Sequence, residues 1–233
     1  MSALIRPGVA AWLARDVDLA RYLAARGIPV ALPCTDPPAG PHRHGELALT
    51  FWRYVPHDPG AVPDTAEVAR SLSAMHTALR GYPGELPADG PLGDIARSLD
   101  LLERRGSVHA AGLHRLRAAA IRLRAAVAEL PTQPLHGDPH TGNVLATSDG
   151  PVWIDFEDTW RGPLAWDLAS FADTPNGVSP ALLDTYPEAL PAGVAVCARL
   201  RELFAVCWRL VMAVRFPAAE PGAQAHLRAW LAA

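Results

Sequence analysis

The sequence predicts an α+β fold in which helices outnumber strands. Two short runs, residues 143–147 and 152–156, are rich in branched and aromatic residues, and Gly150 lies in the polar stretch between them. That arrangement is typical of a β-hairpin. Helical spacing of apolar residues dominates most of the remaining chain. With 233 residues, the chain is long enough to bury a sizeable core, as one large domain or as one domain with a small appendage.

The N-terminal part predicts one helix and two strands. Residues 16–26 carry apolar side chains at helical spacing, and Gly27 is a typical residue to end such a helix. Residues 28–30 and 46–55 are expected as strands, because both runs are apolar or aromatic. The stretch 33–45 between them is rich in Pro, Gly and His, and we expect a loop there.

The rest of the chain predicts helices on either side of the hairpin. Asp64 with Glu67 forms a capping-box-like start for a helix that runs to about Arg80. Further helices are expected over residues 91–105, 107–130, 180–190, 192–216 and 222–232.

The hairpin carries residues that suit metal-assisted chemistry. A hairpin folded about Asp149 places Asn143 opposite Asp155, and directly opposed residues have Cβ atoms roughly 4.5–5.5 Å apart. Amide and carboxylate oxygens are hard ligands that suit Mg²⁺. Asp138, five residues before Asn143, could orient or deprotonate a hydroxyl group. Together these residues indicate phosphoryl transfer.

Three linked segments resemble the aminoglycoside phosphotransferase family, a small-molecule branch of the protein-kinase-like fold. His136-Gly137-Asp138 with Asn143 resembles its H-G-D-x-x-x-x-N catalytic loop, and residues 154–157 resemble its I-D-[FW]-E segment. Residues 162–169 resemble its G-D-P-x-x-D-L-A stretch, although Gly-Pro-Leu replaces Gly-Asp-Pro at its start.

The resemblance implies a role for each matching residue. Asp138 would be the catalytic base, and His136 would belong to the catalytic loop and orient it through hydrogen bonds. Asn143 and Asp155 would hold Mg²⁺ on the phosphates of ATP or GTP. Asp167 would be a structural acid that braces the loop.

The resemblance also implies a two-lobed, kinase-like α+β fold with a truncated nucleotide lobe over residues 1–56 and a helical lobe over residues 57–233. Asp16 would be the acid on the helix that normally pairs with a strand lysine. No lysine occurs, since all 21 basic Lys and Arg positions are Arg, and no glycine-rich loop precedes Asp16. Trp52 and Tyr54 resemble the hinge that meets adenine, but they could equally be ordinary strand and core aromatics.

The expected function is therefore Mg²⁺-dependent transfer of the terminal phosphate of a nucleoside triphosphate to a hydroxyl of a small molecule. The alternative is a non-catalytic kinase-fold protein that binds a ligand or partner, and a metal-dependent hydrolase ranks third. A zinc site at His136 and His140 is disfavoured, because Gly137, Pro139 and Gly142 prevent a helix there. An incomplete first lobe would expose a sheet edge, through which a homodimer could form.

Composition excludes several other classes. A net charge of −3 and a pI near 6.3 argue against a nucleic-acid partner. Three cysteines without paired metal spacing suit a reducing compartment. The first residues include Arg6-Pro7-Gly8 and do not form a signal peptide. The longest apolar run, residues 203–214, contains Arg209 and is too short to cross a membrane. We therefore expect a cytoplasmic protein.

Overall fold

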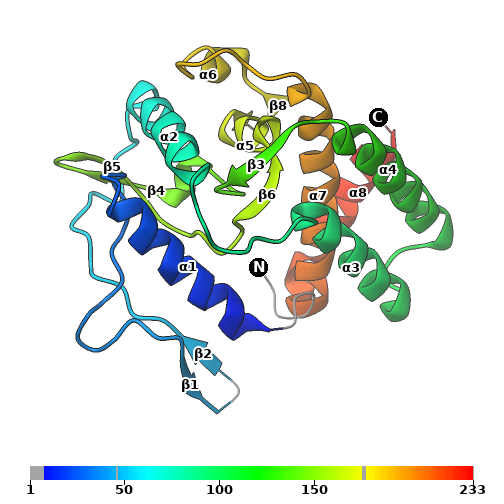
Figure 1. Cartoon of the computed structure of the whole chain (residues 1–233). Coiled ribbons are helices and arrows are strands. Elements are labelled where there is room, and N and C mark those ends of the chain that lie inside the picture. Colours follow the sequence, from blue (N-terminus) through cyan, green and yellow to red (C-terminus); the bar gives the residue numbers. More distant parts are fainter. Residues whose placement is uncertain (1–7, 46, 175–176, 233) are drawn as a thin grey trace.

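The computed structural model describes residues 8–45, 47–174 and 177–232. Helices lie on both sides of the molecule, and several of the short strands lie between them (Figure 1). The helices are α1 (Val9–Ala24), α2 (Thr65–Leu79), α3 (Gly90–Arg105), α4 (Ala110–Ala128), α5 (Leu164–Phe171), α6 (Pro180–Leu183), α7 (Val194–Arg215) and α8 (Glu220–Ala232). The strands are β1 (His42–His44), β2 (Leu47–Leu49), β3 (Thr132–Leu135), β4 (Val144–Thr147), β5 (Gly150–Trp153), β6 (Trp160–Pro163), β7 (Asp173–Thr174) and β8 (Gly177–Val178). This mixture confirms the α+β class.

Two clusters of buried apolar side chains hold these elements together. The larger cluster joins α3, α4, α5, α7 and α8 with β3 and β6, and the smaller one joins α1 and α2 with the β4–β5 hairpin. Leu135 at the end of β3 belongs to the larger cluster, whereas Val144 at the start of β4 belongs to the smaller one. Residues 136–143 therefore cross from one core to the other, and both of their ends are anchored by burial.

The expected hairpin forms, but its register is one residue different from the prediction. Val144 faces Trp153 and Thr147 faces Gly150, so the turn consists of two residues and is not centred on Asp149. The Thr147 hydroxyl donates to the carbonyl oxygen of Gly150 at 2.8 Å and closes the hairpin there. Gly150 takes a φ of 109°, which suits glycine at this turn.

The expected opposition of Asn143 and Asp155 is consequently wrong. Asn143 stands opposite Ile154, whose N–H donates to the carbonyl oxygen of Asn143 at 3.0 Å. A slip of one residue moves a strand side chain to the opposite face. Asp155 leaves the strand altogether, with a φ of 67° in the left-handed region.

The first expected strand, residues 28–30, is present only as a single bridge. Val30 pairs with Trp153 in parallel, and the N–H of Ala31 donates to the carbonyl oxygen of Trp153 at 2.9 Å. Pro29 and Pro33 interrupt this stretch, and proline has no N–H to contribute to a ladder. The segment therefore docks beside β5 without forming a strand of its own.

The second expected strand, residues 46–55, is also shorter than predicted. Only β2 forms, Trp52 makes an isolated bridge with Pro33, and Glu46 lies outside the described residues. The expected loop over 33–45 contains β1, which pairs with β2. The prediction extended the strand too far because it followed the apolar residues, and it missed the histidine-rich partner strand β1.

The helices agree better with the sequence. The carboxylate of Asp64 accepts a hydrogen bond from the N–H of Glu67 at 2.8 Å and starts α2, as the capping box predicts. α1 begins earlier than expected, at Val9. The helix predicted over residues 180–190 is only α6, because Pro187 and Pro191 prevent its continuation.

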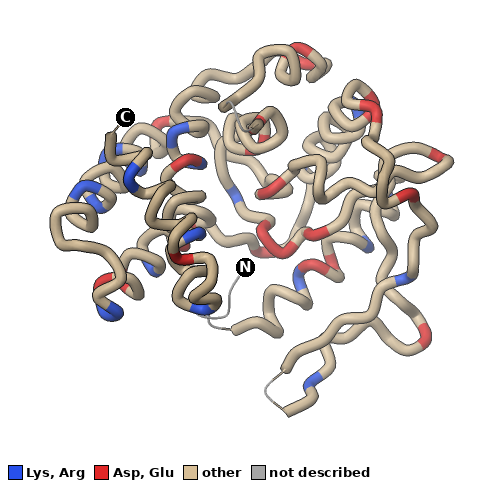
Figure 2. The backbone as a smooth tube through the Cα atoms, turned by 180° about the vertical axis from the view of Figure 1, so that it is seen from behind, with Lys and Arg blue, Asp and Glu red and all other residues tan. Residues whose placement is uncertain are grey.

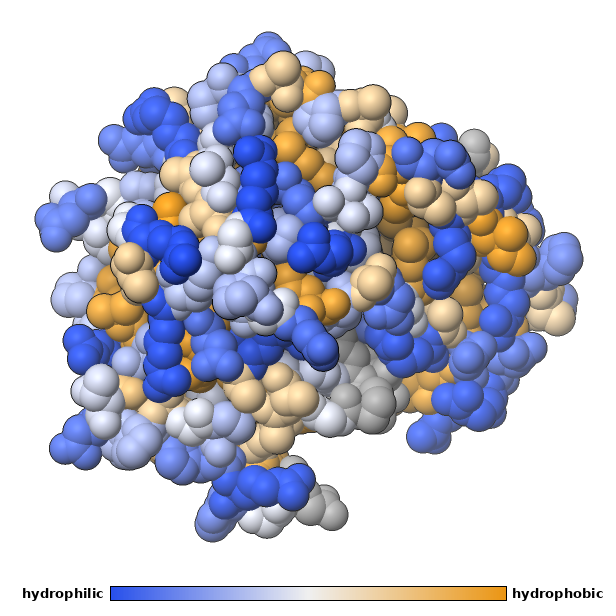
Figure 3. Space-filling view, viewed as in Figure 1, coloured by the Kyte–Doolittle hydropathy of each residue, from blue (hydrophilic) through white to orange (hydrophobic). Residues whose placement is uncertain are grey.

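The described residues contain no helix that combines the length and apolar character needed to cross a bilayer. On the face shown in Figure 3, hydrophilic and hydrophobic residues are interspersed.

Candidate active site

The loop between β3 and β4 is shaped by one glycine. Gly137 has a φ of 96°, and a Cβ at this position would collide with the carbonyl group of Asp158. Only glycine permits both this backbone conformation and this close approach. The loop therefore packs directly on the segment that follows β5. The motif of residues 136–143 is in this way brought next to the motif of residues 154–157.

His136 is fully buried beneath this loop. Its ring lies between Trp153 and Phe156, with ring centroids 5.3 and 4.9 Å apart, respectively. Its Nδ1 accepts a hydrogen bond from the N–H of Asp138 at 3.3 Å, so Nε2 carries the proton that is donated to the carbonyl oxygen of Ile154 at 3.2 Å. Burial lowers the pKa of His136 and favours this neutral form. The side chain is placed to position the loop.

Asp167 receives three hydrogen bonds at the back of the same loop. Its carboxylate accepts from the N–H of His136 at 2.8 Å and from the N–H of Gly137 at 3.0 Å. The ring of His76 contacts it at 2.9 Å, and the other ring nitrogen of His76 lies 3.0 Å from the hydroxyl of Tyr186. Asp167, His76 and the loop are buried, so these bonds satisfy groups that have little access to water.

Asp138 lies at the edge of the loop, with its side chain 29% exposed. Its Oδ1 contacts the guanidinium of Arg201 at 3.0 Å and accepts from the hydroxyl of Ser170 at 3.2 Å, and its Oδ2 lies 3.3 Å from Nε2 of His140. Burial alone would raise the pKa of Asp138, but His140 and Arg201 outweigh it and lower the pKa below the usual value. The hydrogen bond to Asp138 in turn raises the pKa of His140. Asp138 is thus held as a carboxylate.

Asn143 links Asp138 to the segment of residues 154–157, which contains Asp155. Its side-chain nitrogen donates to the carbonyl oxygen of Asp138 at 2.9 Å, and its own carbonyl oxygen accepts from Ile154, the residue before Asp155. The amide oxygen of Asn143 is therefore the side-chain atom left to act as a ligand. Burial raises the pKa of Asp155 to about 6, and the charges of Glu157 and Asp158 add to this effect.

Asp16 extends this acidic region from α1. Its carboxylate accepts a hydrogen bond from the N–H of Phe156 at 3.1 Å. Burial raises the pKa of Asp16 to about 7; the hydrogen bond to Phe156 opposes the shift, and the neighbouring charges of Asp155 and Glu157 increase it. Figure 2 shows several Asp and Glu positions gathered near the centre of the molecule. A bound cation would relieve this repulsion.

The described residues include no cluster of three or more His, Cys, Asp or Glu side chains arranged to hold a metal ion. The sequence motifs indicate two residues with hard oxygen atoms as metal ligands, namely the carboxylate of Asp155 and the amide of Asn143. A metal ion here would need further oxygens from a ligand such as a nucleotide phosphate.

The two aromatic residues of the expected hinge have different surroundings. Trp52 is half-buried against the smaller core, and its indole N–H donates to the hydroxyl of Thr50 at 3.0 Å. Tyr54 is 79% exposed, with its ring centroid 6.1 Å from that of His57. Contact of either residue with a nucleotide base stays a prediction.

Two contacts of Asp138 were not expected from the sequence. Arg201 comes from α7 and also contacts the carboxylate of Asp173 at 3.1 Å, and Ser170 comes from the end of α5. No local pattern marks Arg201 among the arginines of α7. Ser170 does follow the matched 162–169 stretch directly, so its position beside the loop could have been proposed.

A narrow crevice of about 20 Å³ opens beside Asp138. Its lining includes Arg201 and Phe204 of α7 together with Gly137 and Asp158.

Comparisons with known proteins agree with these motifs. A family model described as "Phosphotransferase enzyme family" matches residues 3–203. No curated protein matches the chain. The family resemblance noted in the sequence is thereby confirmed.

Solved structures with the same fold include several kinases. Amicoumacin kinase hAmiN, in complex with AMP-PNP, Ca²⁺ and its ligand, has a TM-score of 0.69 and 13% identity over 92% of this chain and 77% of that chain. A choline/ethanolamine kinase family protein from Mesorhizobium loti has a TM-score of 0.62 and 22% identity over the same shares. The GDP and kanamycin complex of APH(2")-IIia has a TM-score of 0.65 and 14% identity over 94% and 82%. At these identities the likeness concerns the fold, and it confirms the kinase-like class.

Proposed function

The chain belongs to the phosphotransferase enzyme family, and we propose that it transfers the terminal phosphate of ATP or GTP, with Mg²⁺, to a hydroxyl group of a small molecule. A phosphotransferase acting on small molecules is the function that the family and its kinase neighbours support. The nucleotide, the metal and the acceptor class are our inferences.

One observation carries the proposal. Asn143 is tied by its side chain to Asp138 and by its main chain to Ile154, the neighbour of Asp155. Asp138 can act on a hydroxyl, and Asn143 and Asp155 can bind a metal ion. The two hydrogen bonds therefore fix these groups relative to each other. Phosphoryl transfer depends mainly on such positioning and on neutralisation of charge.

The donor set at Asn143 and Asp155 fits Mg²⁺. Both offer hard oxygen atoms, and the acids around Asp155 create a negative field that favours a divalent cation. When bound, Mg²⁺ would neutralise the charge of the nucleotide phosphates. The similar structure of amicoumacin kinase was crystallised with AMP-PNP and Ca²⁺, which supports the use of a nucleotide and a divalent cation.

Asp138 would act on the acceptor. Ser170 and Arg201 hold Oδ1, and Oδ2 lies 3.3 Å from Nε2 of His140. A carboxylate oxygen can accept more than one hydrogen bond, so Oδ2 could still orient an incoming hydroxyl and receive its proton. The lowered pKa makes Asp138 a weak base, which is sufficient if the proton leaves late in a loose transition state. His136 and Asp167 would be positioning residues that keep the loop in this conformation.

The proposal also includes the predicted contacts with the nucleotide base and the predicted division into two lobes. Trp52 and Tyr54 would flank the nucleotide base, and residues 1–56 and 57–233 would form the two lobes. A non-catalytic binding protein is not favoured, since the similar solved structures include kinases and phosphotransferases.

The proposal is tested by phosphate transfer from γ-labelled ATP and GTP, with Mg²⁺, to a panel of small alcohols. The Asp138→Asn variant is the control, because it keeps the shape of the side chain and removes the basic carboxylate. Transfer by the wild type and not by the variant supports the proposal. Wild-type protein that binds neither nucleotide with Mg²⁺ would contradict it.

A further inference from the structure

A groove of about 980 Å³ lies between α4, α7 and α8. Its volume is at the upper end of the range of roughly 300–1,000 Å³ that is typical for binding pockets. Every residue that lines it belongs to one of these three helices, and none of them also lines the crevice beside Asp138. Nothing in the mechanism proposed above uses this groove.

The helices of this part of the molecule are strongly basic. α3, α4, α7 and α8 together contain twelve arginines and five acidic residues, whereas the rest of the chain contains nine arginines and nineteen acidic residues. Figure 2 shows Lys and Arg positions gathered on the side of the molecule that carries the C-terminus. The net charge of −3 is therefore unevenly distributed, and the positive part would attract a negatively charged partner.

Two Arg-Leu-Arg triplets in α4 divide their arginines between two faces of the helix. The triplets begin at Arg115 and Arg122, which are seven residues and hence about 10 Å apart along the helix. The second arginine of each triplet serves the fold. Arg117 contacts two carboxylates of α3 at 2.8 and 2.7 Å, and Arg124 donates to a carbonyl oxygen of α3 at 3.5 Å.

The first arginine of each triplet lines the groove. Arg115 and Arg122 are exposed, and their guanidinium groups have no hydrogen-bond or ion-pair partner among the described residues. Arg199 and Glu202 of α7 also line the groove, but they pair with each other at 3.5 Å and add no net charge. The groove therefore keeps two positive charges that the described part of the chain does not neutralise.

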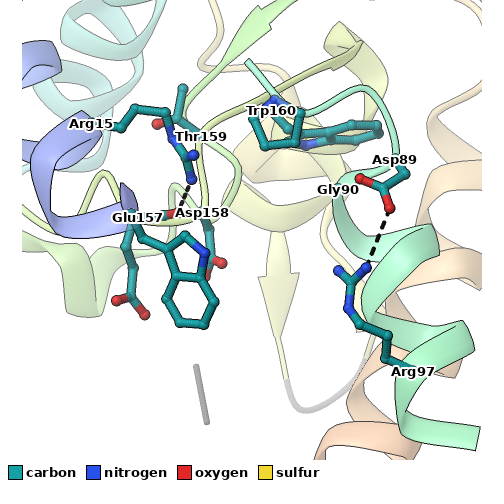
Figure 4. A pocket seen from close by; sticks show the side chains of 10 residues that line it. Arg15, Asp89, Gly90, Arg97, Glu157, Asp158, Thr159 and Trp160 are labelled. Atoms are coloured by element: carbon teal, nitrogen blue, oxygen red, sulfur yellow. Dashed lines mark hydrogen bonds and ion pairs between the residues drawn. The ribbon is translucent and has the colours of Figure 1, made fainter. Parts of the chain in front are cut away.

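A second cavity of about 220 Å³ provides a contrast, because its arginines are already paired. Arg15 donates to the carbonyl oxygen of Glu157 at 2.9 Å, and Arg97 contacts the carboxylate of Asp89 at 3.4 Å (Figure 4). These groups are occupied within the protein and are not available to a partner. The unpaired arginines of the groove are what distinguishes it.

The groove also offers apolar surface beside its charges. Leu123, Val196 and Trp230 are partly buried and pack against the larger core, and Ala119 belongs to that core. Other lining residues of α4 and α7 are alanines, whose small side chains let a bound segment approach closely. A partner must therefore present both apolar and acidic side chains.

The secondary structure around the groove indicates the conformation of that partner. An extended segment binds best along a free sheet edge, and the walls of this groove are helices. A helical segment satisfies its own backbone groups and can lay an apolar stripe into such a groove. Acidic residues seven residues apart lie on one side of a helix and would match the spacing of Arg115 and Arg122.

We propose that the groove between α4, α7 and α8 is a docking site for an amphipathic, acidic helix of a partner protein. The apolar stripe of that helix would pack on Leu123 and Trp230, and its acidic residues would pair with Arg115 and Arg122. One docked helix covers less area than a standard protein–protein interface, so the contact belongs to the weak, transient class. The inference does not depend on phosphate transfer.

The test measures the fluorescence anisotropy of labelled peptides with the full chain. The probe has three Leu-Glu-Gln-Leu-Ala-Gln-Ala repeats, which place leucines on one stripe of a helix and glutamates seven residues apart beside it. A second peptide has glutamine, and a third has lysine, in place of each glutamate.

Two charge-reversal variants and one filling variant are compared with the wild type. Arg115→Glu/Arg122→Glu reverses the charges of the groove. Arg104→Glu/Arg105→Glu is the matched control, because these exposed arginines of α3 do not line the groove. Ala126→Phe fills the groove from an exposed position and leaves the core unchanged.

We expect the wild type to bind the glutamate peptide about fivefold more tightly than the glutamine peptide, the effect of two partly exposed ion pairs. High salt should reduce this preference. Arg115→Glu/Arg122→Glu should lose the glutamate peptide and bind the lysine peptide, whereas the control variant should keep the wild-type preference. Ala126→Phe should weaken binding of both the glutamate and the glutamine peptide.

Three outcomes would overturn the inference. The first is a wild type that does not bind the glutamate peptide, and the second is equal loss of binding in the groove and control variants. The third is binding that Ala126→Phe leaves unchanged, since the peptide would then lie outside the groove. Sedimentation of the chain alone tests a different occupant: a wild-type dimer that Arg115→Glu/Arg122→Glu dissociates would assign the groove to a second copy and also overturn the inference.

Discussion

Two neighbouring carboxylates in this site have opposite surroundings. Asp138 contacts Arg201, Ser170 and His140, and its pKa is lowered. Asp155 is surrounded by other acids, and burial and those charges raise its pKa to about 6. Asp16, which accepts a hydrogen bond from the N–H of Phe156, shares this second environment, and its pKa is raised to about 7.

The difference shows how one loop can serve two tasks. Arg201 and His140 supply positive charge next to Asp138, so the carboxylate of Asp138 is ready to orient a hydroxyl. The Asp155 side collects negative charge that a cation with a nucleotide would neutralise. Changes on the two sides should therefore affect different quantities, and the predictions below test that separation.

The largest effect is expected for Asp155→Asn. Asparagine tolerates the left-handed backbone at this position, so the fold should be kept while the charged ligand is lost. Turnover with Mg²⁺-nucleotide should fall at least about 1,000-fold, or about 4 kcal/mol. Steady-state kinetics over a range of Mg²⁺ concentrations checks this, and a variant with normal Mg²⁺ dependence would remove Asp155 from the metal site.

Asp138→Asn should reduce turnover by roughly 10²–10⁴-fold, the usual share of general-base catalysis. Nucleotide affinity should change little, because Asp138 is expected to face the acceptor. Comparison of kcat with the nucleotide Kd checks both parts. If Asp138→Asn turned over at the wild-type rate, the carboxylate of Asp138 would not be required for phosphate transfer.

Asp16→Asn should make stability less sensitive to pH. The folded state raises the pKa of Asp16 from 3.8 to about 7, so the wild type loses stability as pH rises through this interval, and the loss is complete above it. The variant should match the wild type near pH 4 and be more stable by up to about 4 kcal/mol at pH 8. Urea unfolding at both pH values measures this. A constant difference between the two proteins at all pH values would contradict the raised pKa.

Arg201→Ala should lower turnover about tenfold, or about 1.4 kcal/mol, because Asp138 loses the group that orients Oδ1. Arg201→Lys should restore part of the activity, since the charge is retained. Arg199→Ala is the matched control on the same helix, as Arg199 is exposed and pairs only with Glu202 among the described residues. Equal effects of the Arg201→Ala and Arg199→Ala variants would indicate damage to α7 and not loss of positioning.

The sequence predicted the parts of the site that depend on local residue types. The loop of His136 to Asn143 and the capping box at Asp64 follow from residues close together in the chain. The register of the hairpin was wrong by one residue, because either of two turns could be drawn through Ser148-Asp149-Gly150-Pro151. The turn that forms is the one closed by the hydrogen bond from the Thr147 hydroxyl to the carbonyl oxygen of Gly150. Strand and turn propensities do not predict that contact.

Long-range contacts were beyond the reach of sequence patterns. Arg201 contacts Asp138 across 63 residues of sequence, and α7 carries three other arginines, Arg199, Arg209 and Arg215, from which no sequence pattern distinguishes it. The packing of the Trp160 ring depends on Gly90 and Gly162, two glycines far apart in the sequence, because a Cβ at either would collide with it. Packing of separate elements determines both features.

The central claim is that Asp155 acts on the metal and nucleotide while Asp138 acts on the acceptor. Its most direct test is the binding of AMP-PNP by calorimetry, with and without Mg²⁺, to the wild type, Asp155→Asn and Asp138→Asn. Our account predicts that Mg²⁺ strengthens binding to the wild type and to Asp138→Asn, and that this effect is absent in Asp155→Asn. The same Mg²⁺ effect in Asp155→Asn as in the wild type, or its loss in Asp138→Asn alone, would contradict the account.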